Sequence, residues 1–194
     1  MAGALAYEPV VDEREQYELI NGEVYMMPRP SINHARIAKK ILGIFDRYLK
    51  GKRCEAFGEV DVHLGEKDNF IPDVIIVCNP DIIKYDAIYG TPDLVVEILS
   101  PSTALKDRTI KLATYAKYGV KEYWLVDPRG KSVEVYLLRD GVLLLDNVYF
   151  LHSERWLKAI GAEERAKAEA QKMIKVSLYD DFIIDVADVF EDVD

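Results

Sequence analysis

Two short apolar runs, each carrying one carboxylate among aliphatic residues, most constrain how this chain can fold. The first spans Ile71–Val77 and contains Asp73, and the second spans Pro92–Leu99 and contains Glu97. Runs of this length that are rich in β-branched residues predict buried strands. A buried carboxylate without a partner costs so much free energy that a fold normally pairs it with a base or a cation. We therefore expect Asp73 and Glu97 to mark a site.

Neighbouring strands can bring these two carboxylates together. If the runs pair antiparallel, Val77 lies near Leu94 and Asp73 lies opposite Ile98, although the long loop between them leaves the register free by a residue or two. Within that range Asp73 and Glu97 share one face, with side chains about 5 Å apart. Two carboxylates on a rigid sheet suit Mg²⁺ or Mn²⁺ better than zinc. The alternative is that Asp73 starts its strand as a turn residue and Glu97 pairs with a buried base.

A string of short motifs after Glu97 carries a family resemblance. In order they are Ser100-Pro101-Ser102-Thr103, Asp107-Arg108, Lys111-Leu112, Tyr115-Ala116, Gly119-Val120 and Glu122-Tyr123-Trp124. Together with Pro72-Asp73, this string resembles a restriction-endonuclease domain family, long labelled as of unknown function, within the PD-(D/E)XK nuclease superfamily. The resemblance covers about residues 17 to 140 and resumes from Leu178 to Phe190.

The resemblance implies a fold and a reaction. The fold is α/β (α+β), a restriction-endonuclease-like core in which helices flank a central mixed β-sheet, with an N-terminal β-hairpin. The reaction is hydrolysis of phosphodiester bonds in a nucleic acid, with DNA as the expected substrate and Mg²⁺ or Mn²⁺ as cofactor. Asp73, Glu97 and the carbonyl of Ile98 are then the metal ligands. The superfamily places a lysine two residues after the glutamate, where this chain has Leu99, and the resemblance implies that Lys111 takes over its role.

The position of Lys111 on the following helix is compatible with that role. A helix over 104–118 runs back along the sheet, so that Lys111 and Glu97 both lie about 10 Å from the turn between helix and strand. The predicted core stripe of this helix is Leu105, Thr109, Leu112 and Ala116. Along one edge of the stripe lie Arg108, Lys111 and Tyr115. The alternative is a flanking lysine with its stem on the core and its charge in water.

The remaining elements follow from turns and periodicity. Asn21-Gly22 predicts a hairpin within Tyr17–Met27, and Ser31 caps a helix that ends at Leu49. Alternating residues predict a strand over Cys54–Leu64. A strand, helix, strand succession from Leu94 to Val126 predicts a right-handed parallel crossover. Helix, three-strand meander, helix and strand form the superfamily core.

Four further residues are possible accessory members of the site. His34 lies on the inward stripe of the first helix, where it is either a core histidine or a site residue that the resemblance marks. Glu59 lies on an acidic strand face, which is either solvated or contributes a ligand. Glu18 flanks the hairpin with Glu23, and we interpret both first as exposed residues. Arg108 lies beside Lys111 on the edge of its helix.

A charged helical pattern runs from Ser153 to Lys172. It is either a decoration that packs on a partner subunit, which would make the protein a homodimer, or a solvated helix. We expect residues 1–194 to form a single domain that includes this segment. The length and the 49% content of hydrophobic residues are sufficient for one core.

Charge and cysteines bear on function and compartment. The net charge of −9 opposes nucleic-acid binding, but Arg29–Arg53 holds eight basic residues against one acid. The acidic balance, together with Leu99 in place of the superfamily lysine, favours a competing class, a binding or assembly module that keeps the fold without turnover. A third option is a metal-dependent hydrolase that acts on nucleotides and not on polymers. Cys54 and Cys78 are most simply reduced core thiols of a cytoplasmic protein. Met1–Tyr17 lacks a signal-peptide pattern, and no apolar run is long enough to span a membrane.

Overall fold

A computed structural model describes residues 16–193 of the protein. The expectation about a signal peptide concerns Met1–Tyr17 and therefore lies almost wholly outside the described residues. None of the helices within 16–193 combines the length and the hydropathy needed to cross a membrane.

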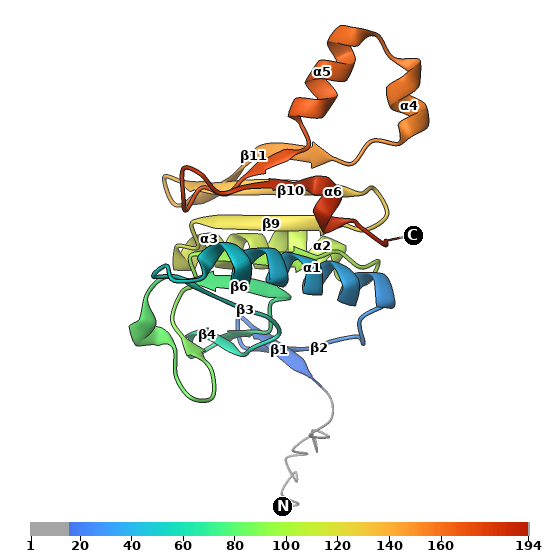
Figure 1. The fold of residues 1–194 in the computed structure, drawn as a ribbon. Coiled ribbons are helices and arrows are strands. Elements are labelled where there is room, and N and C mark those ends of the chain that lie inside the picture. The colour runs from blue at the N-terminus through green and yellow to red at the C-terminus, as the bar shows by residue number, and fades with distance from the viewer. Residues whose placement is uncertain (1–15, 194) are drawn as a thin grey trace, which may run out of the picture.

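A mixed six-stranded sheet forms the centre of the fold (Figure 1). Its order is β11-β10-β9-β8-β6-β3, and only β8 and β9 run parallel. The strands are β3 (Glu55–Phe57), β6 (Val74–Val77), β8 (Leu94–Ile98), β9 (Glu122–Asp127), β10 (Ser132–Arg139) and β11 (Val142–Phe150). The parallel pair is the crossover that the sequence predicts, and the mixed sheet confirms the predicted fold class.

A smaller five-stranded sheet contains the N-terminal hairpin. Its order is β2-β1-β5-β4-β7. Its strands are β1 (Tyr17–Ile20), β2 (Glu23–Met26), β4 (Val62–Gly65), β5 (Asp68–Phe70) and β7 (Ile88–Tyr89), and a 3₁₀ turn, η1 (Pro80–Ile82), precedes β7. Asn21 and Gly22 both have positive φ, as a tight hairpin turn requires, so the predicted hairpin is confirmed.

The single strand predicted over Cys54–Leu64 is wrong. It divides into β3 of the large sheet and β4 of the small sheet, and the chain turns between them at Glu59, whose φ is +49°. Alternating side chains are equally compatible with one long strand and with two short strands, so the pattern alone could not place the break.

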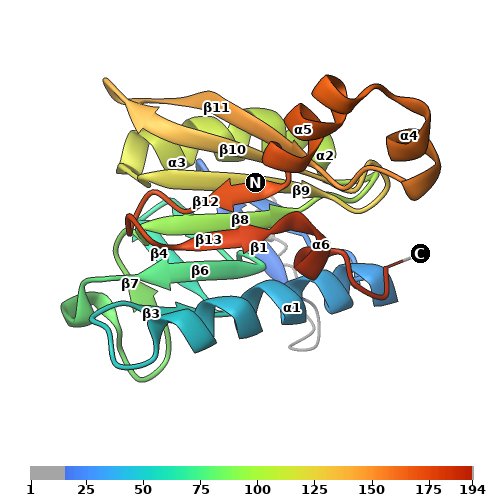
Figure 2. The ribbon, with the colours of Figure 1, turned by 45° about the horizontal axis from the view of Figure 1, so that its top comes forward.

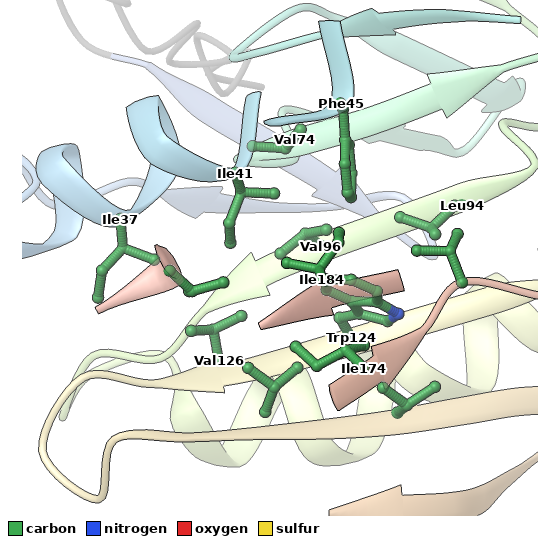
Figure 3. Packing of buried hydrophobic residues seen from close by; sticks show 14 of the residues in the cluster. Ile37, Ile41, Phe45, Val74, Leu94, Val96, Trp124, Val126, Ile174 and Ile184 are labelled. Atoms are coloured by element: carbon green, nitrogen blue, oxygen red, sulfur yellow. The ribbon is translucent and has the colours of Figure 1, made fainter. Parts of the chain in front are cut away.

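Helix α1 (Ile32–Leu49) covers one face of the large sheet. The Ser31 hydroxyl accepts a hydrogen bond from the backbone N–H of His34, which confirms the predicted cap. The C-terminal segment covers the rest of this face through β12 (Met173–Lys175), β13 (Ile183–Asp185) and α6 (Val186–Val189), as Figure 2 shows. Figure 3 shows Ile41 and Phe45 of α1 packed with Trp124 of β9 and Ile184 of β13.

The opposite face of the large sheet packs against the small sheet and a second helical segment. This segment comprises α2 (Ala104–Lys106), a π-helical turn η2 (Asp107–Lys111) and α3 (Leu112–Tyr118). The core stripe predicted for it is wrong in its first half, because Leu105 is 78% exposed and Thr109 is also exposed. Asp107, Lys111 and Tyr115 are buried instead.

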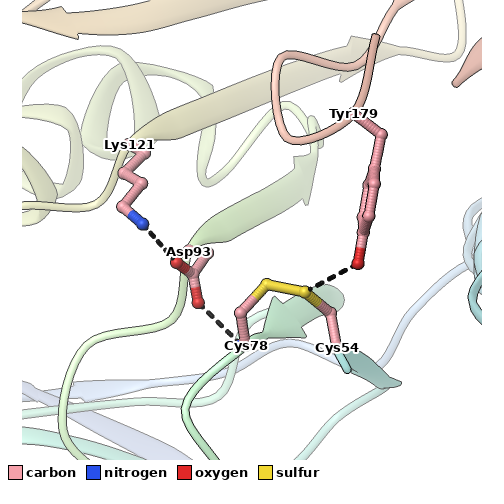
Figure 4. Close-up of a disulfide and its surroundings, with 5 residues drawn as sticks. All are labelled: Cys54, Cys78, Asp93, Lys121 and Tyr179. Carbon is pink, nitrogen blue, oxygen red and sulfur yellow. Dashed lines mark hydrogen bonds and ion pairs between the residues drawn. A yellow bond between two sulfur atoms is a disulfide. The ribbon is translucent and has the colours of Figure 1, made fainter. Parts of the chain in front are cut away.

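Cys54 and Cys78 form a disulfide (Figure 4), so the prediction of two reduced thiols is wrong. Glu55 pairs with Val77 across the antiparallel strands β3 and β6. Cys54 directly precedes Glu55 and Cys78 directly follows Val77, so the two cysteines lie opposite each other, with their Cα atoms 4.0 Å apart. The hydroxyl of Tyr179 donates a hydrogen bond to Cys54 Sγ over 3.1 Å. Nothing in the spacing of the two cysteines along the chain signals this proximity.

The charged segment predicted as one helix from Ser153 to Lys172 forms two. Helices α4 (Glu154–Ala159) and α5 (Ala162–Ala170) are separated at Ile160 and Gly161. They project beyond the edge strand β11, away from the large sheet (Figure 1). Only Ala168 of the two helices is buried against the rest of the described chain.

Candidate active site

The pairing of β6 with β8 brings Asp73 and Glu97 to the same face. Val74 pairs with Val96, so Asp73, which directly precedes β6, lies opposite Glu97. The predicted register was one residue off, since it placed Asp73 opposite Ile98. Asp73 and Glu97 are only 8% and 5% exposed. Asp73 Oδ2 accepts a hydrogen bond from the backbone N–H of Ile98 over 2.6 Å, which fixes the carboxylate at the end of β8.

His34 contacts the other oxygen of Asp73. Its Nε2 lies 2.7 Å from Asp73 Oδ1, at the start of helix α1. Burial alone would lower the pKa of His34, but the hydrogen bond and the negative charge of Asp73 outweigh it and raise the pKa above its ordinary value. The structure therefore places His34 in the site, as the resemblance marked it, and not in the apolar core.

Glu97 accepts two hydrogen bonds at one carboxylate oxygen. Lys111 Nζ and the hydroxyl of Tyr115 both donate to Glu97 Oε1, over 2.8 and 2.7 Å. Burial, opposed by Lys111 and reinforced by the neighbouring carboxylates of Asp107 and Glu18, raises the pKa of Glu97 to about 8. Lys111 thus lies at Glu97, and not in water as the alternative interpretation proposed.

Lys111 is surrounded by acidic side chains. Besides Glu97, its Nζ lies 2.6 Å from Glu18 Oε1 and 3.8 Å from Asp107 Oδ1. Burial would lower the pKa of Lys111, but these three carboxylates raise it above its ordinary value, so the amine keeps its proton. Lys111 is 3% exposed, so its charge is neutralised almost entirely by protein groups.

The interpretation of Glu18 as an exposed hairpin flank is wrong. Its side chain is buried and accepts hydrogen bonds or ion pairs from both Lys106, over 2.9 Å, and Lys111. Burial would raise the pKa of Glu18, but the two lysines lower it, so this residue is a carboxylate at neutral pH. Glu23, the other flank, is exposed as expected and accepts from Tyr25. The available signal was that Glu18 lies two residues before Ile20, so both side chains face the same buried side of β1.

The π-helical turn explains how Lys111 comes to point inward. It adds a residue to the helical turn at 107–111 and so changes which side chains face the sheet. Asp107, Lys111 and Tyr115 then form one buried row at i, i+4 and i+8. Short π turns of this kind are frequent at functional sites. The sequence analysis used Asp107 for the family resemblance but did not assign it to the site. Its position four residues before Lys111, on the same side of a helix, could have indicated that it lies there.

The two remaining predicted accessory residues line the same cavity without contacting the carboxylate pair. Glu59 is exposed in the turn between β3 and β4, where its backbone N–H donates to Pro72 O. Arg108 is also exposed and pairs with Glu134 of β10 over 2.5 Å. Glu59 is thus available to a ligand in the cavity, whereas Arg108 is engaged at its wall.

A cavity of about 640 Å³ opens onto this cluster. Its walls come from the linker before α1, the end of β8 with the loop that follows, the second helical segment and the turn between β9 and β10. The titratable groups that line it are Glu18, Arg29, His34, Glu59, Asp73, Lys106, Asp107, Arg108, Lys111, Asp127 and Arg129. This cavity is the route by which a substrate can approach Asp73 and Lys111.

The carboxylate oxygens of this site are the kind of ligand that a hard divalent cation prefers. Asp73 and Glu97 supply carboxylate oxygens on one face, and acidic groups outnumber bases at the centre of the site. The buried Oδ1 of Asp107 has no hydrogen-bond partner among residues 16–193 and lies 3.8 Å from Lys111 Nζ, so this oxygen has room to accept a further hydrogen bond. Against this, no group of three or more metal-ligating side chains is arranged around one point within the described chain. A cation would therefore rely on these two carboxylates and on backbone or water oxygens.

The arrangement of mixed sheet, flanking helices and carboxylate pair defines a nuclease-like fold. A solved structure from Anabaena variabilis ATCC 29413, described as "a putative nuclease belonging to DUF820", matches it with a TM-score of 0.68. The match covers 90% of this chain and 89% of that chain at 21% sequence identity, so it bears on the fold alone.

The chain belongs to the Uma2 family, whose description is "Putative restriction endonuclease" and whose model matches residues 4–160. A relative from Synechocystis, the uncharacterized protein slr1290, is 33% identical over 153 residues. These residues are 77% of this chain and 80% of that relative. The family that the sequence motifs predicted is thereby confirmed.

Proposed function

We propose that this protein is a metal-dependent nuclease that hydrolyses phosphodiester bonds at the site formed by Asp73, Glu97 and Lys111. The observation that carries the proposal is the contact of Lys111 Nζ with Glu97 Oε1 at 2.8 Å, on the sheet face that Asp73 shares. This contact supports the interpretation that Lys111, on the next helix, takes the role of the lysine that the superfamily places at the position of Leu99. The family membership supports the same reaction class.

Each residue has a role that its surroundings favour. Asp73, Glu97 and the carbonyl of Ile98 hold Mg²⁺ or Mn²⁺, whose chemistry in such sites is to polarise a phosphoryl oxygen and to lower the pKa of bound water. Lys111 keeps its proton, so it acts as a fixed positive charge that stabilises the charge developing on the phosphate, and not as a base. His34 orients Asp73 through their 2.7 Å contact.

A cleavage assay tests this assignment. Supercoiled plasmid and single-stranded DNA are incubated with the protein and Mg²⁺ or Mn²⁺, and wild type is compared with Asp73→Asn, Glu97→Gln and Lys111→Gln, with thermal melting of each variant as a check of folding. We expect each variant to lose at least about 100-fold in rate, since each removes a group that acts on the transition state. The matched control is Asp146→Asn on β11, which does not line the cavity and should cleave like wild type. Unchanged cleavage by all three site variants contradicts the assignment.

A second candidate function is nucleic-acid binding without turnover. It is favoured by one observation, that Glu97 is held by Lys111 and Tyr115 and is absent from the cavity wall. Calorimetric titration with Mn²⁺ separates the two functions. Binding below millimolar concentration that disappears in Asp73→Asn supports the nuclease, whereas the absence of any binding supports the module without turnover.

A further inference from the structure

The outward face of helix α1 carries a row of basic side chains that the candidate site does not use. Their spacing of three and four residues places them on one side of the helix, opposite the side that packs on the large sheet. The row consists of Arg36, Lys39, Lys40, Arg47 and Lys50. The only acid in α1 is Asp46. Because the whole chain has a net charge of −9, this helix face differs in sign from the rest of the protein.

The basic row begins beside the cavity of the candidate site. Asn33 lines that cavity and accepts a hydrogen bond from Arg36 Nη1 over 3.3 Å. From Arg36 to Lys50 the row extends for about 21 Å along the helix axis. This length equals the rise of about six base pairs in a duplex. A nucleic acid that binds at the cavity can therefore continue along α1.

Three side chains of the row are available to an anion. Lys39, Arg47 and Lys50 are exposed, and none of these side chains has an ion-pair or hydrogen-bond partner within residues 16–193. Lysine and arginine clustered along one helix are the electrostatic footprint expected of a protein that binds nucleic acid. Each unpaired side chain can neutralise one phosphate.

Gly43 lies at the centre of the row. Among the described residues, a Cβ at this position would have only Arg47 Nη1 within 4 Å, at the ordinary contact distance of 3.6 Å. Packing therefore does not require a glycine here, although glycine inside a helix costs about 1 kcal/mol relative to alanine. A residue without a side chain lets the backbone of a ligand approach the helix closely.

Acidic side chains of the same chain already bind the row at Lys40. Lys40 Nζ contacts Glu191, and it lies 3.4 Å from Asp192 Oδ2. These acids follow α6, which lies beside α1 (Figure 2). The side chains of Glu191 and Asp192 are 66% and 75% exposed. Ion pairs with such exposure contribute little to stability, so a polyanion can replace these two carboxylates.

We propose that the basic row of α1 binds the phosphate backbone of duplex DNA beside the cleaved phosphate, and that Glu191 and Asp192 compete with that backbone for Lys40. This inference rests on the proposed function, because it assigns a binding surface to the same substrate. A straight row on one helix suits a stiff duplex, which bends little over such a length. Contacts with phosphates position a duplex without reading its sequence.

Binding in EDTA, where no cleavage occurs, tests this proposal separately from catalysis. Fluorescence anisotropy measures the affinity for a labelled DNA duplex over a range of salt concentrations. The row variant combines Lys39→Gln, Arg47→Gln and Lys50→Gln. Its slope of log K against log salt should be smaller by about 2.7, which is about 0.9 for each lost phosphate contact, and its affinity at about 0.1 M salt should fall by at least about 100-fold.

A control variant removes the same net charge from another surface. It combines Arg155→Gln, Lys158→Gln and Lys167→Gln, which are exposed on α4 and α5 and line neither the cavity nor the row. This variant should bind the duplex like wild type. An equal loss of affinity in the control and row variants means that net charge alone governs binding, and it overturns the proposal.

The double variant Glu191→Gln/Asp192→Asn tests the competition at Lys40. Without the two carboxylates Lys40 can contact a phosphate, so the duplex should bind several-fold more tightly and the salt slope should grow by about 0.9. Binding that is equal to or weaker than that of wild type overturns the competition. Thermal melting of every variant checks that it is folded.

The outcomes separate this inference from the proposed function. Equal binding by wild type and the row variant overturns the inference even if plasmid DNA is cleaved, and so does a wild type that does not bind the duplex. Weaker binding by the row variant, with the expected change in slope, supports the inference even if no cleavage is found, in which case the nuclease assignment fails.

Discussion

Lys111 and Glu97 are fourteen residues apart in the chain, yet Lys111 Nζ lies 2.8 Å from Glu97 Oε1 in the interior. The strand ends at Ile98, the chain turns, and the π-helical turn directs Lys111 back to the strand. A lysine two residues after the glutamate would share its face of the strand, and here Leu99 occupies that position. The fold thus brings a lysine and a carboxylate together from two elements.

Removing the Lys111 charge should destabilise the protein strongly. Lys111→Met leaves Glu18 and Glu97 without their shared cation, and breaking one partner of a buried ion pair costs about 3–5 kcal/mol. Urea unfolding monitored by tryptophan fluorescence measures this loss. The triple variant with Glu18→Gln and Glu97→Gln should recover most of the stability, because it removes the unpaired acids. A Lys111→Met protein as stable as wild type contradicts the buried network.

The raised pKa of Glu97 makes a pH-dependent prediction for stability. Glu97 titrates near 4.5 when unfolded and at about 8 when folded, so the folded state holds the proton more tightly. The stabilisation from this proton is present below about pH 4.5 and is lost as pH rises toward 8. The glutamine side chain introduced by Glu97→Gln is neutral at every pH. The melting temperature of the variant should therefore equal that of wild type near pH 5 and exceed it by several degrees near pH 8.

The same pair of proteins supplies the control for this prediction. Wild type and Glu97→Gln are melted in EDTA at half-unit pH steps. Every other titrating group is present in both proteins, so the difference between the two melting temperatures reports on Glu97. A difference in melting temperature that stays constant with pH means that Glu97 has an ordinary pKa. A variant that melts well below wild type throughout means that Glu97 serves mainly as an ion-pair partner of Lys111.

The disulfide makes the protein sensitive to reduction. Cys54 and Cys78 close a loop with a sequence separation of 24. A cross-link that closes a loop of this length stabilises a fold by about 3 kcal/mol, mainly because it lowers the conformational entropy of the unfolded chain. The double variant Cys54→Ser/Cys78→Ser should lose this amount in urea unfolding, and dithiothreitol should affect wild type but not the variant. Two free thiols titrated in freshly purified wild type, without any effect of dithiothreitol, would contradict the bond.

Divalent cations should stabilise the folded protein. A cation that binds Asp73 and Glu97 only in the folded state raises the free energy of unfolding by mass action, by about 2.7 kcal/mol at a hundredfold excess over Kd. The melting temperature rises with it. Millimolar Mn²⁺ should therefore raise the melting temperature of wild type by several degrees and leave Asp73→Asn and Glu97→Gln unchanged. The Asp146→Asn control should respond like wild type. An equal shift in all four proteins would indicate binding elsewhere.

The sequence predicted correctly the elements that depend on only a few neighbouring residues. The hairpin at Asn21-Gly22, the cap of α1 at Ser31 and the parallel crossover are confirmed, because turn chemistry and periodicity act over a few residues. The pairing of β6 with β8 was predicted to within one residue. One residue matters here, because it places Asp73 opposite Glu97 itself.

What the sequence could not supply depends on contacts between distant segments. The π-helical turn has no pattern of its own, so the helix from Ala104 was given a regular stripe and Leu105 was placed in the core. Glu18 is buried only because Lys106 and Lys111 reach it from another element. The partner of Cys54 is likewise set by strand pairing and not by spacing along the chain.

Metal binding by Asp73 and Glu97 can be seen directly in a crystal structure of the protein soaked in Mn²⁺, with anomalous data collected near the manganese absorption edge. We expect one strong anomalous peak between Asp73 and Glu97, within about 2–2.5 Å of an oxygen of each, and no peak in crystals of Asp73→Asn grown and soaked in the same way. An empty site at tens of millimolar Mn²⁺, with Lys111 still bound to Glu97, would contradict this expectation.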